Sequence, residues 1–425
     1  MGQVFITLGL LIFLKIPLLS LPSQAATANQ RCLACHGQDS KINEKYQISE
    51  ATFATSVHGR LECTSCHRVS EGESEAEIPH ARDIPDVHCT AVCHRENAKP
   101  REGLDPLIYP DSVHGRAYLE RGVKEAARCW DCHGKHNIRR PNDPESTVHR
   151  ANIPLTCSAC HEDMHVVVKY HIHKEMPYQE YRRSTHGRAL FEKGLVRFAA
   201  VCTDCHGVHN IQGVGQPRLM AKQPETCGAC HELIYQEYKK SIHGLQAMAG
   251  NPDAPLCVDC HGEHAIYSPE EPVSSTSANK VPDTCSSCHA RPEIMKKYGI
   301  PQDRIATFIE SMHGIAVGFG YKAAANCSSC HGVHDIRPAS DPLSRVNPIN
   351  LAKTCGQPHC HPRMSEKIAT AKVHIGVEEK SPPALFYVQR VLLIFVAVIL
   401  SITILWFIPG FIKKARLLRT RKGKS

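Results

Sequence analysis

The sequence lacks any cysteine outside a short paired motif. All 22 cysteines fall into eleven pairs, and in every pair the second cysteine is followed at once by histidine. No cysteine therefore remains to serve as a free catalytic thiol or to form a structural disulfide. The chain also lacks the length for an ordinary core, because residues 26–383 provide about 33 residues per motif. So short a segment cannot bury enough apolar surface of its own.

The eleven motifs carry the attachment pattern of c-type haem. Two thiols add to the two vinyl groups of one porphyrin, and the adjacent imidazole binds the iron from one side. Nine pairs have two residues between the cysteines, whereas the third pair has three and the last has four. We number the motifs 1 to 11 in chain order and expect each to hold one covalent haem c, with its histidine as the proximal iron ligand. They are Cys32/Cys35/His36, Cys63/Cys66/His67, Cys89/Cys93/His94, Cys129/Cys132/His133, Cys157/Cys160/His161, Cys202/Cys205/His206, Cys227/Cys230/His231, Cys257/Cys260/His261, Cys285/Cys288/His289, Cys327/Cys330/His331 and Cys355/Cys360/His361.

Zinc sites and disulfides are the alternative uses of paired cysteines. A zinc ribbon needs four ligands per metal and does not require histidine directly after a cysteine pair. Eleven such junctions would arise by chance only at vanishing frequency, since the chain has 28 histidines in 425 residues. The junction therefore favours haem attachment over both alternatives.

Between the motifs the sequence repeats, and each repeat contains two motifs. The five repeats begin with a Ser-x-His-Gly block near residues 56, 112, 184, 241 and 311, and motif 1 precedes them. In repeats 2 to 5 the first motif continues as Cys-His-Gly-x-His. We expect the histidines at these two recurrent positions to be the second, distal iron ligands. The Gly-x-His residues are expected to bind the iron of a neighbouring motif. The first kind are His58, His114, His186, His243 and His313, and the second kind are His136, His209, His264 and His334.

Two more histidines complete a set of eleven distal ligands. His374, in Lys-Val-His-Ile-Gly, resembles the start of a sixth Ser-x-His-Gly block. The first repeat departs from the pattern, since Arg-Val-Ser follows His67, so His80 or His88 must substitute, and we assign His80. Methionine, the usual rival ligand, does not recur at one place in the repeat: Met164, Met248, Met295 and Met364.

A further cluster, His165, His171 and His173, lies in a stretch where apolar and polar residues alternate. These side chains are either solvated surface residues or part of a short strand, a loose metal site or a proton-coupled redox site.

The two ends of the chain predict export and a membrane anchor. Residues 1–26 read as a signal peptide, although the absence of lysine and arginine before its apolar run leaves an uncleaved anchor open. Residues 385–409 predict one transmembrane helix, and the basic tail 410–425 places that end in the cytoplasm. Without the tail, Arg390 and Lys15, the net charge falls from +8 to −1, and haem propionates would lower it further. We therefore expect no nucleic-acid partner.

Residues 27–384 predict a periplasmic domain that is mostly α-helical with much irregular structure, packed around haem. Helical turns are expected at Glu232 to Lys240, Pro177 to Arg183 and Asp303 to Glu310. The Ser-x-His-Gly and Cys-His-Gly-x-His blocks resemble the multihaem cytochromes c with doubled Cys-x-x-Cys-His motifs, including the tetrahaem c554-like and octahaem-reductase-like types. The resemblance implies stacked haem pairs that act as a wire. The anchor here is C-terminal, unlike the N-terminal anchor of the quinol-oxidising tetrahaem family.

The leading functional prediction is electron transfer. A membrane-tethered undecahaem cytochrome in the cytoplasmic membrane would pass electrons between a quinone-linked, cytochrome b-like membrane subunit and periplasmic or extracellular acceptors. Six-coordinate irons favour this role, because they have no vacant position for a substrate. The alternative is a multihaem oxidoreductase that acts on a small nitrogen or sulfur compound at one five-coordinate haem. We identify no catalytic residue in the sequence.

Overall fold

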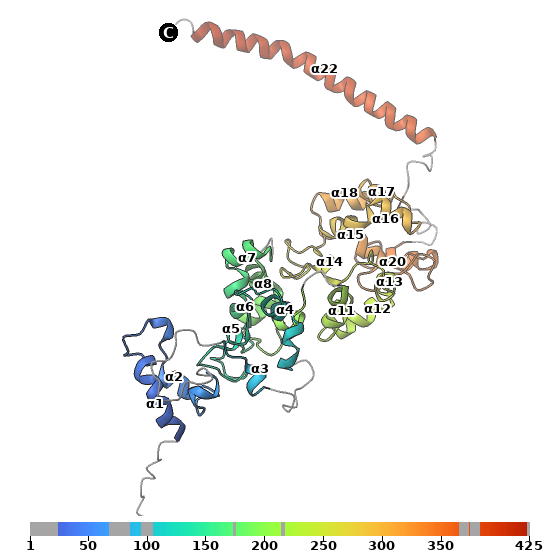
Figure 1. Cartoon of the computed structure of the whole chain (residues 1–425). Helices are drawn as coiled ribbons and strands as arrows, with labels where there is room; N and C mark the ends of the chain where they lie inside the picture. The colour runs from blue at the N-terminus through green and yellow to red at the C-terminus, as the bar shows by residue number, and fades with distance from the viewer. Residues whose placement is uncertain are drawn as a thin grey trace, which may run out of the picture. The chain divides into compact units, whose positions relative to one another are not determined.

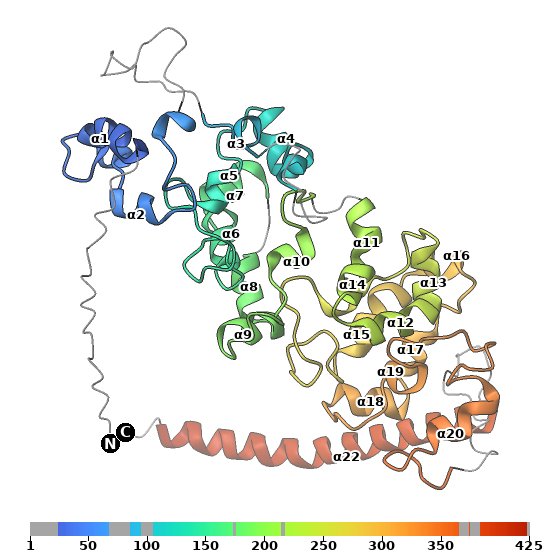
Figure 2. The same cartoon turned by 90° about the horizontal axis from the view of Figure 1, so that it is seen from below.

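The computed structural model describes residues 24–67, 86–94, 105–172, 176–213, 217–364, 374 and 383–422. These residues form short helices joined by turns and loops, followed by one long C-terminal helix (Figures 1 and 2). The described residues contain no β-strand, and one isolated parallel bridge joins Gly37 and Ile48. The prediction of a mostly helical chain with much irregular structure is confirmed. The signal peptide falls almost entirely outside the described residues.

The chain divides into two compact units, Met1–Gln236 with Leu256–Tyr267, and Glu237–Pro255 with Ser268–Ser425. Each contains several copies of the same short elements. Helices of unit 1 are α1 (Gln24–His36), α2 (Glu50–Thr55), α3 (Cys89–Val92), α4 (Val113–Leu119), α5 (Cys129–His133), α6 (Ile153–His161), α7 (Met164–Tyr170), α8 (Pro177–Arg183), α9 (Thr185–Phe191), α10 (Cys202–His206), α11 (Pro217–Gly228) and α14 (Cys257–His261), with 3-10 turns η1 (Glu44–Tyr46), η2 (Cys63–Ser65) and η3 (Pro106–Asp111). Helix α12 (Glu232–Lys240) begins in unit 1 and ends in unit 2, which contains α13 (Ile242–Met248), α15 (Val281–His289), α16 (Pro292–Lys297), α17 (Arg304–Ile309), α18 (Met312–Gly318), α19 (Cys327–His331), η4 (Pro348–Asn350), α20 (Leu351–Cys355) and α22 (Pro383–Lys422).

Four of the Ser-x-His-Gly blocks begin a seven-residue helix: α4, α9, α13 and α18. The serine is the N-cap, and its Oγ accepts the backbone N–H of the glycine three residues on, as in Ser184 and Gly187 at 3.1 Å. Close packing explains why the fourth residue of the block is glycine. A Cβ at Gly187 would lie 2.0 Å from the carbonyl oxygen of Tyr181 in the preceding helix α8. The block therefore fixes its histidine on a helix that lies directly against its predecessor.

The Cys-His-Gly-x-His blocks turn at their glycine. Gly134, Gly207, Gly262 and Gly332 have φ between 80° and 90°, a region that side-chain-bearing residues rarely enter. Two residues beyond each distal histidine, a backbone carbonyl accepts an N–H from the Ser-x-His-Gly block of the preceding repeat. These bonds are Val57 to Ile138, Val113 to Ile211, Thr185 to Ile266 and Ile242 to Ile336, at 2.7 to 2.8 Å. Consecutive repeats within each unit are thus joined at equivalent places.

The apolar core is small. Apart from prolines, only nine apolar side chains of the described residues are buried, and the main cluster consists of Tyr181, Leu190, Ala199 and Val201. Several of the most deeply buried side chains are instead serines, among them Ser112, Ser146, Ser184, Ser241 and Ser344. A polypeptide of this length normally buries far more apolar surface.

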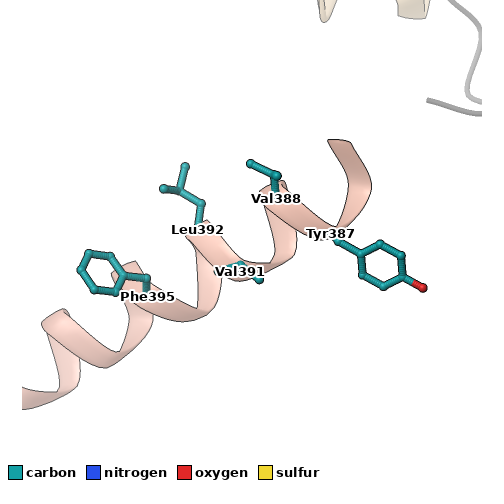
Figure 3. A pocket seen from close by; sticks show the side chains of 5 residues that line it. All are labelled: Tyr387, Val388, Val391, Leu392 and Phe395. Carbon is teal, nitrogen blue, oxygen red and sulfur yellow. The ribbon is translucent and has the colours of Figure 1, made fainter. Parts of the chain in front are cut away.

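Helix α22 contains a segment, Arg390–Gly410, that is long and apolar enough to cross a membrane. Its apolar side chains are exposed. Ser401 Oγ and Thr403 Oγ1 donate to carbonyls one turn back, at 2.7 Å each, which satisfies both hydroxyls without water. A shallow apolar hollow near its start is lined by α22 alone, through Tyr387, Val388, Val391, Leu392 and Phe395 (Figure 3).

The three helical segments expected from sequence correspond to α12, α8 and α17, the last shorter by one residue at each end. The suggestion of a strand at His165 to His173 is wrong. Residues Met164–Tyr170 form helix α7, which ends where His171 adopts a left-handed conformation with φ of 49°. Within this helix Val167 is buried and Val168 is exposed. His173 lies outside the described residues.

Candidate functional site

Each regular Cys-x-x-Cys-His motif forms about one turn of helix. In helix α10 the motif is the whole element, from Cys202 to His206. Residues three and four apart lie on the same face of a helix, so Cys205 and His206 both lie near the face that carries Cys202. The local fold therefore presents two sulfurs and one imidazole on one side of the turn.

The structure distinguishes the two cysteines of a motif, which the sequence pattern treats as equivalent. None of the 22 cysteines, all of which lie within the described residues, forms a disulfide, and the first cysteine of every motif is half-buried. The second cysteine is exposed at Cys35, Cys93, Cys205, Cys230 and Cys360, and half-buried at Cys66, Cys132, Cys160, Cys260, Cys288 and Cys330. In five motifs the two cysteines therefore differ in burial, although the sequence pattern does not distinguish them. Exposure leaves those five sulfurs accessible for attachment, which stays a prediction.

In the two wider motifs the backbone of the histidine hydrogen-bonds to the first cysteine, as it does in motif 7. In motif 3 the backbone N–H of His94 donates to the carbonyl of Cys89 at 3.1 Å, and in motif 11 that of His361 donates to Cys355, also at 3.1 Å. The same bond in motif 7 measures 2.9 Å. The extra residues before Cys360 therefore lie within the turn, and the histidine keeps its bond to the first cysteine of the motif.

Each described odd-numbered motif after motif 1 faces a Ser-x-His-Gly histidine. The motif histidine and the distal histidine come from the same repeat and have ring centres 6.0 to 6.3 Å apart. The pairs are His58 with His94, His114 with His161, His186 with His231, His243 with His289, and His313 with His361.

Motifs 2, 4 and 6 face the Gly-x-His histidine of the following repeat. The pairs within unit 1 are His67 with His136, His133 with His209, and His206 with His264, with ring centres 5.9 to 6.1 Å apart. At the end of the series His374 faces His331 at 6.3 Å. His374 therefore occupies the place that a Gly-x-His residue has in earlier repeats, not that of a Ser-x-His-Gly residue as its sequence suggests. Its Nδ1 lies 3.1 Å from Thr307 Oγ1.

These nine separations match the space that one metal ion needs. Each metal–nitrogen bond is about 2 Å, and each nitrogen lies about 1 Å from its ring centre, so two opposed imidazoles on one ion have centres about 6 Å apart. The observed range is 5.9 to 6.3 Å. The pairs are also too far apart for a direct hydrogen bond between the rings.

Four other predicted ligands are His36, His261, His334 and His80. His36 ends α1, and its Nδ1 lies 3.0 Å from the carbonyl oxygen of Tyr46, the kind of bond that orients a ligating imidazole. His261 ends α14 in unit 1, and His334 follows Gly332 in unit 2. His80 lies outside the described residues, whereas the alternative His88 is exposed just before α3.

Burial favours the neutral form of ten of the predicted ligand histidines, and the neutral imidazole is the form that binds a metal. Burial lowers the pKa of His243 to about 4, with a further contribution from the charge of His289. Burial is also the main cause of a lowered pKa at His58, His114, His133, His136, His186, His289, His331, His334 and His374.

Successive motifs lie next to one another in chain order. In five places the first cysteines of two consecutive motifs hydrogen-bond: Cys32 with Cys63, Cys89 with Cys129, Cys157 with Cys202, Cys227 with Cys257, and Cys285 with Cys327. In the intervening steps the second cysteine of one motif feels the charge of both cysteines of the next: Cys66 that of Cys89 and Cys93, Cys132 that of Cys157 and Cys160, Cys205 that of Cys227 and Cys230, and Cys330 that of Cys355 and Cys360. Motifs 1 to 8 thus form an unbroken series in unit 1, and motifs 9 to 11 form another in unit 2.

Cys260 and Cys288 are the second cysteines of motifs 8 and 9. Cys260 lies in α14, where its charge acts on the thiol of Cys257. Cys288 lies in α15, where Ser287 Oγ is 3.9 Å from its sulfur. Both are half-buried. Motif 8 contacts motif 7 through its first cysteine, Cys257, and motif 9 contacts motif 10 through its first cysteine, Cys285.

Sequence reasoning missed a tyrosine that supports each central motif. Tyr109, Tyr181 and Tyr238 each donate a hydrogen bond of 2.8 Å to the carbonyl two residues before the first cysteine of motifs 4, 6 and 8. Burial raises the pKa of Tyr109 to about 12. The signal was present in the sequence, because each tyrosine stands five residues before a Ser-x-His-Gly histidine.

Arg150 is a second support that the sequence did not reveal. Its guanidinium contacts both carboxylate oxygens of Asp204, at 2.9 and 2.7 Å, and the carbonyls of Val196 and Ala199. It therefore ties the segment before motif 5 to α10, which carries motif 6.

Among the described residues, no three histidine, cysteine or carboxylate side chains gather to hold a bare metal ion. Each pair offers two nitrogen donors, so the other coordination positions of a metal would need a further group. No protein-family model, curated protein or solved structure matches this chain, so the functional argument depends on this geometry.

Proposed function

We propose that this chain is a membrane-attached c-type cytochrome that holds eleven covalent haems and conducts electrons between a quinone-linked membrane donor and periplasmic or extracellular acceptors. One observation carries the proposal. Nine pairs of opposed imidazoles, 5.9 to 6.3 Å apart, each combine a motif histidine with a histidine from elsewhere in the chain.

The residues present fit haem better than zinc or disulfides. A disulfide would leave the opposed histidines without a purpose, and a tetrahedral zinc site would need further ligands beside each pair. Haem would use both cysteines of a motif and both imidazoles of a pair. It would also supply the apolar surface that a chain with so few buried apolar side chains lacks.

The chain's own residues determine how such groups would act. Bound haem iron supplies one-electron oxidation and reduction. The opposed histidines would hold the iron through two imidazoles and would leave no open position for a substrate. Hydrogen bonds between repeats, such as Thr185 to Ile266 at 2.8 Å, hold neighbouring motifs in contact. The chain thereby orders its motifs as a series, which suits conduction over distance better than chemistry at one centre.

The C-terminal helix supports attachment to a membrane. Arg390–Gly410 is able to span a bilayer by length and composition. We propose that the basic residues after it, including Lys413, Lys414 and Arg416, lie in the cytoplasm by the positive-inside rule. The motifs would then lie on the periplasmic side, where a cytochrome b-like subunit that oxidises quinol meets them.

Redox titration with spin-state spectroscopy tests the function. Purified full-length protein in detergent should show low-spin iron in both oxidation states and reversible voltammetry when adsorbed on an electrode. A matched variant with Cys202 and Cys205 replaced by serine should lose one haem. Adding nitrite or hydroxylamine should leave the spectra unchanged. Turnover of either compound at a high-spin iron would contradict conduction and favour the oxidoreductase alternative.

A further inference from the structure

The opposed histidine pairs fall into two geometric classes. The three Gly-x-His pairs have ring planes inclined by 23° to 33°. The five Ser-x-His-Gly pairs are inclined by 46° to 66°. The pair made by His374, which belongs to neither block, is intermediate at 42°. The class of a pair therefore depends on which block supplies its distal histidine.

The backbone accounts for this division. In four of the five blocks the Ser-x-His-Gly histidine is the second residue of a short helix that is held by its serine cap and by the close approach of its glycine, as in Ser184 and Gly187. In the first block His58 lies in a turn after α2. A Gly-x-His histidine instead follows a glycine with positive φ, as in Gly207 with φ of 82°. The two blocks therefore have different backbone conformations, and each conformation presents its histidine ring to the opposite imidazole in a different orientation.

The inclination of two axial imidazoles matters electronically. Each ring donates π-electron density into the iron d orbital perpendicular to its plane. Nearly parallel rings act on one orbital and separate the two that are available, whereas steeply inclined rings act on both and leave them close in energy. Ligand orientation is one of the means by which a protein tunes a bound metal.

We infer that the chain holds two electronically distinct classes of bis-histidine iron site, which alternate from motif 2 to motif 7. This rests on the proposed function, because it requires haem at the motifs. Even-numbered motifs with Gly-x-His partners form the near-parallel class, and odd-numbered motifs with Ser-x-His-Gly partners form the inclined class. Neighbouring motifs from 2 to 7 therefore differ in class, although every ligand is histidine.

Electron paramagnetic resonance of the oxidised full-length protein tests the inference. We expect a rhombic signal with three resolved g-values from the near-parallel class, and a separate low-field signal of large g anisotropy from the inclined class. Spectra should also be taken at intermediate potentials, where reduced, diamagnetic neighbours remove spin coupling. A single class of low-spin signal would overturn the inference.

Two variants in the same repeat assign the signals. His209→Ala should decrease only the rhombic signal, and His186→Ala should remove about one fifth of the anisotropic signal, since five pairs belong to that class. If both variants decrease the same signal, the assignment is wrong. Covalent haem is measured first: protein without haem would overturn the proposed function as well, whereas haem-loaded protein with one signal class overturns only this inference. If a variant fails to fold, the wild-type spectrum still decides.

Discussion

Replacing Gly314 by alanine should displace one predicted iron ligand. Gly314 lies in α18 directly after His313, where a Cβ would stand 2.0 Å from the carbonyl oxygen of Phe308 and 2.8 Å from Cα of Ile309. Both obstacles are backbone atoms, so no side-chain rotation relieves them. Helix α18 must move away from α17 or twist.

The size of the movement follows from the contact. An ordinary van der Waals contact begins near 3.4 Å, so the two atoms must separate by about 1.4 Å. Overpacking of this kind costs about 1 to 3 kcal/mol. His313 moves with the helix, and a metal–nitrogen bond of about 2 Å does not survive a displacement of that size. His313 is paired with His361 at 6.0 Å, so we expect one low-spin site in eleven to become high-spin.

Gly318→Ala in the same helix is the matched control. A Cβ there meets no atom within 4 Å, so alanine should keep every site low-spin and stabilise the helix by about 0.5 to 1 kcal/mol. The assay is absorption and magnetic resonance spectroscopy of both variants, with thermal unfolding for stability. A Gly314→Ala protein that keeps the wild-type spin state and unfolding midpoint would refute the role of this glycine in placing the ligand.

Three further predictions concern pH, the anchor and the first repeat. Burial raises the pKa of Tyr109 to about 12, above the usual value near 10. The neutral phenol therefore contributes stability in full below about pH 10, and this contribution is lost as the pH rises towards 12. Tyr109→Phe should flatten the loss of stability in alkaline unfolding, and an unchanged profile would reject this role of Tyr109. Truncation after Ser381 removes α22 and should release a soluble haem-loaded protein into the periplasm; retention in the membrane would place the anchor elsewhere. His80→Ala should turn one low-spin iron in eleven high-spin, and a wild-type protein that already has one high-spin iron would reject His80 as a ligand.

Local features of the fold were predictable where they depend on short-range chemistry. The segment from Glu232 to Lys240 reads as a helix because its apolar and charged residues recur at helical spacing, and α12 has those bounds. The strand suggested near His171 fails because alternation over a few residues does not distinguish a strand from one turn of helix with a buried valine.

Pairing of the histidines needed the three-dimensional structure. Spacing indicates that His136 is too close to His133 to reach the opposite side of the same metal, but not which other motif it faces. That choice follows from the contact between repeats, in which Val57 donates to Ile138 at 2.8 Å and brings His136 opposite His67. The position of His374 depends on the same long-range packing, which its local sequence does not encode.

The number of covalent haems on the mature protein tests the central claim most directly. Intact-mass spectrometry of protein matured in a host with a c-type haem attachment apparatus should give eleven haems, because the 22 cysteines form eleven motifs. The wider pairs at Cys89 and Cys355 are the two whose spacing departs from the rest. Fewer than nine haems on properly matured protein would contradict the account.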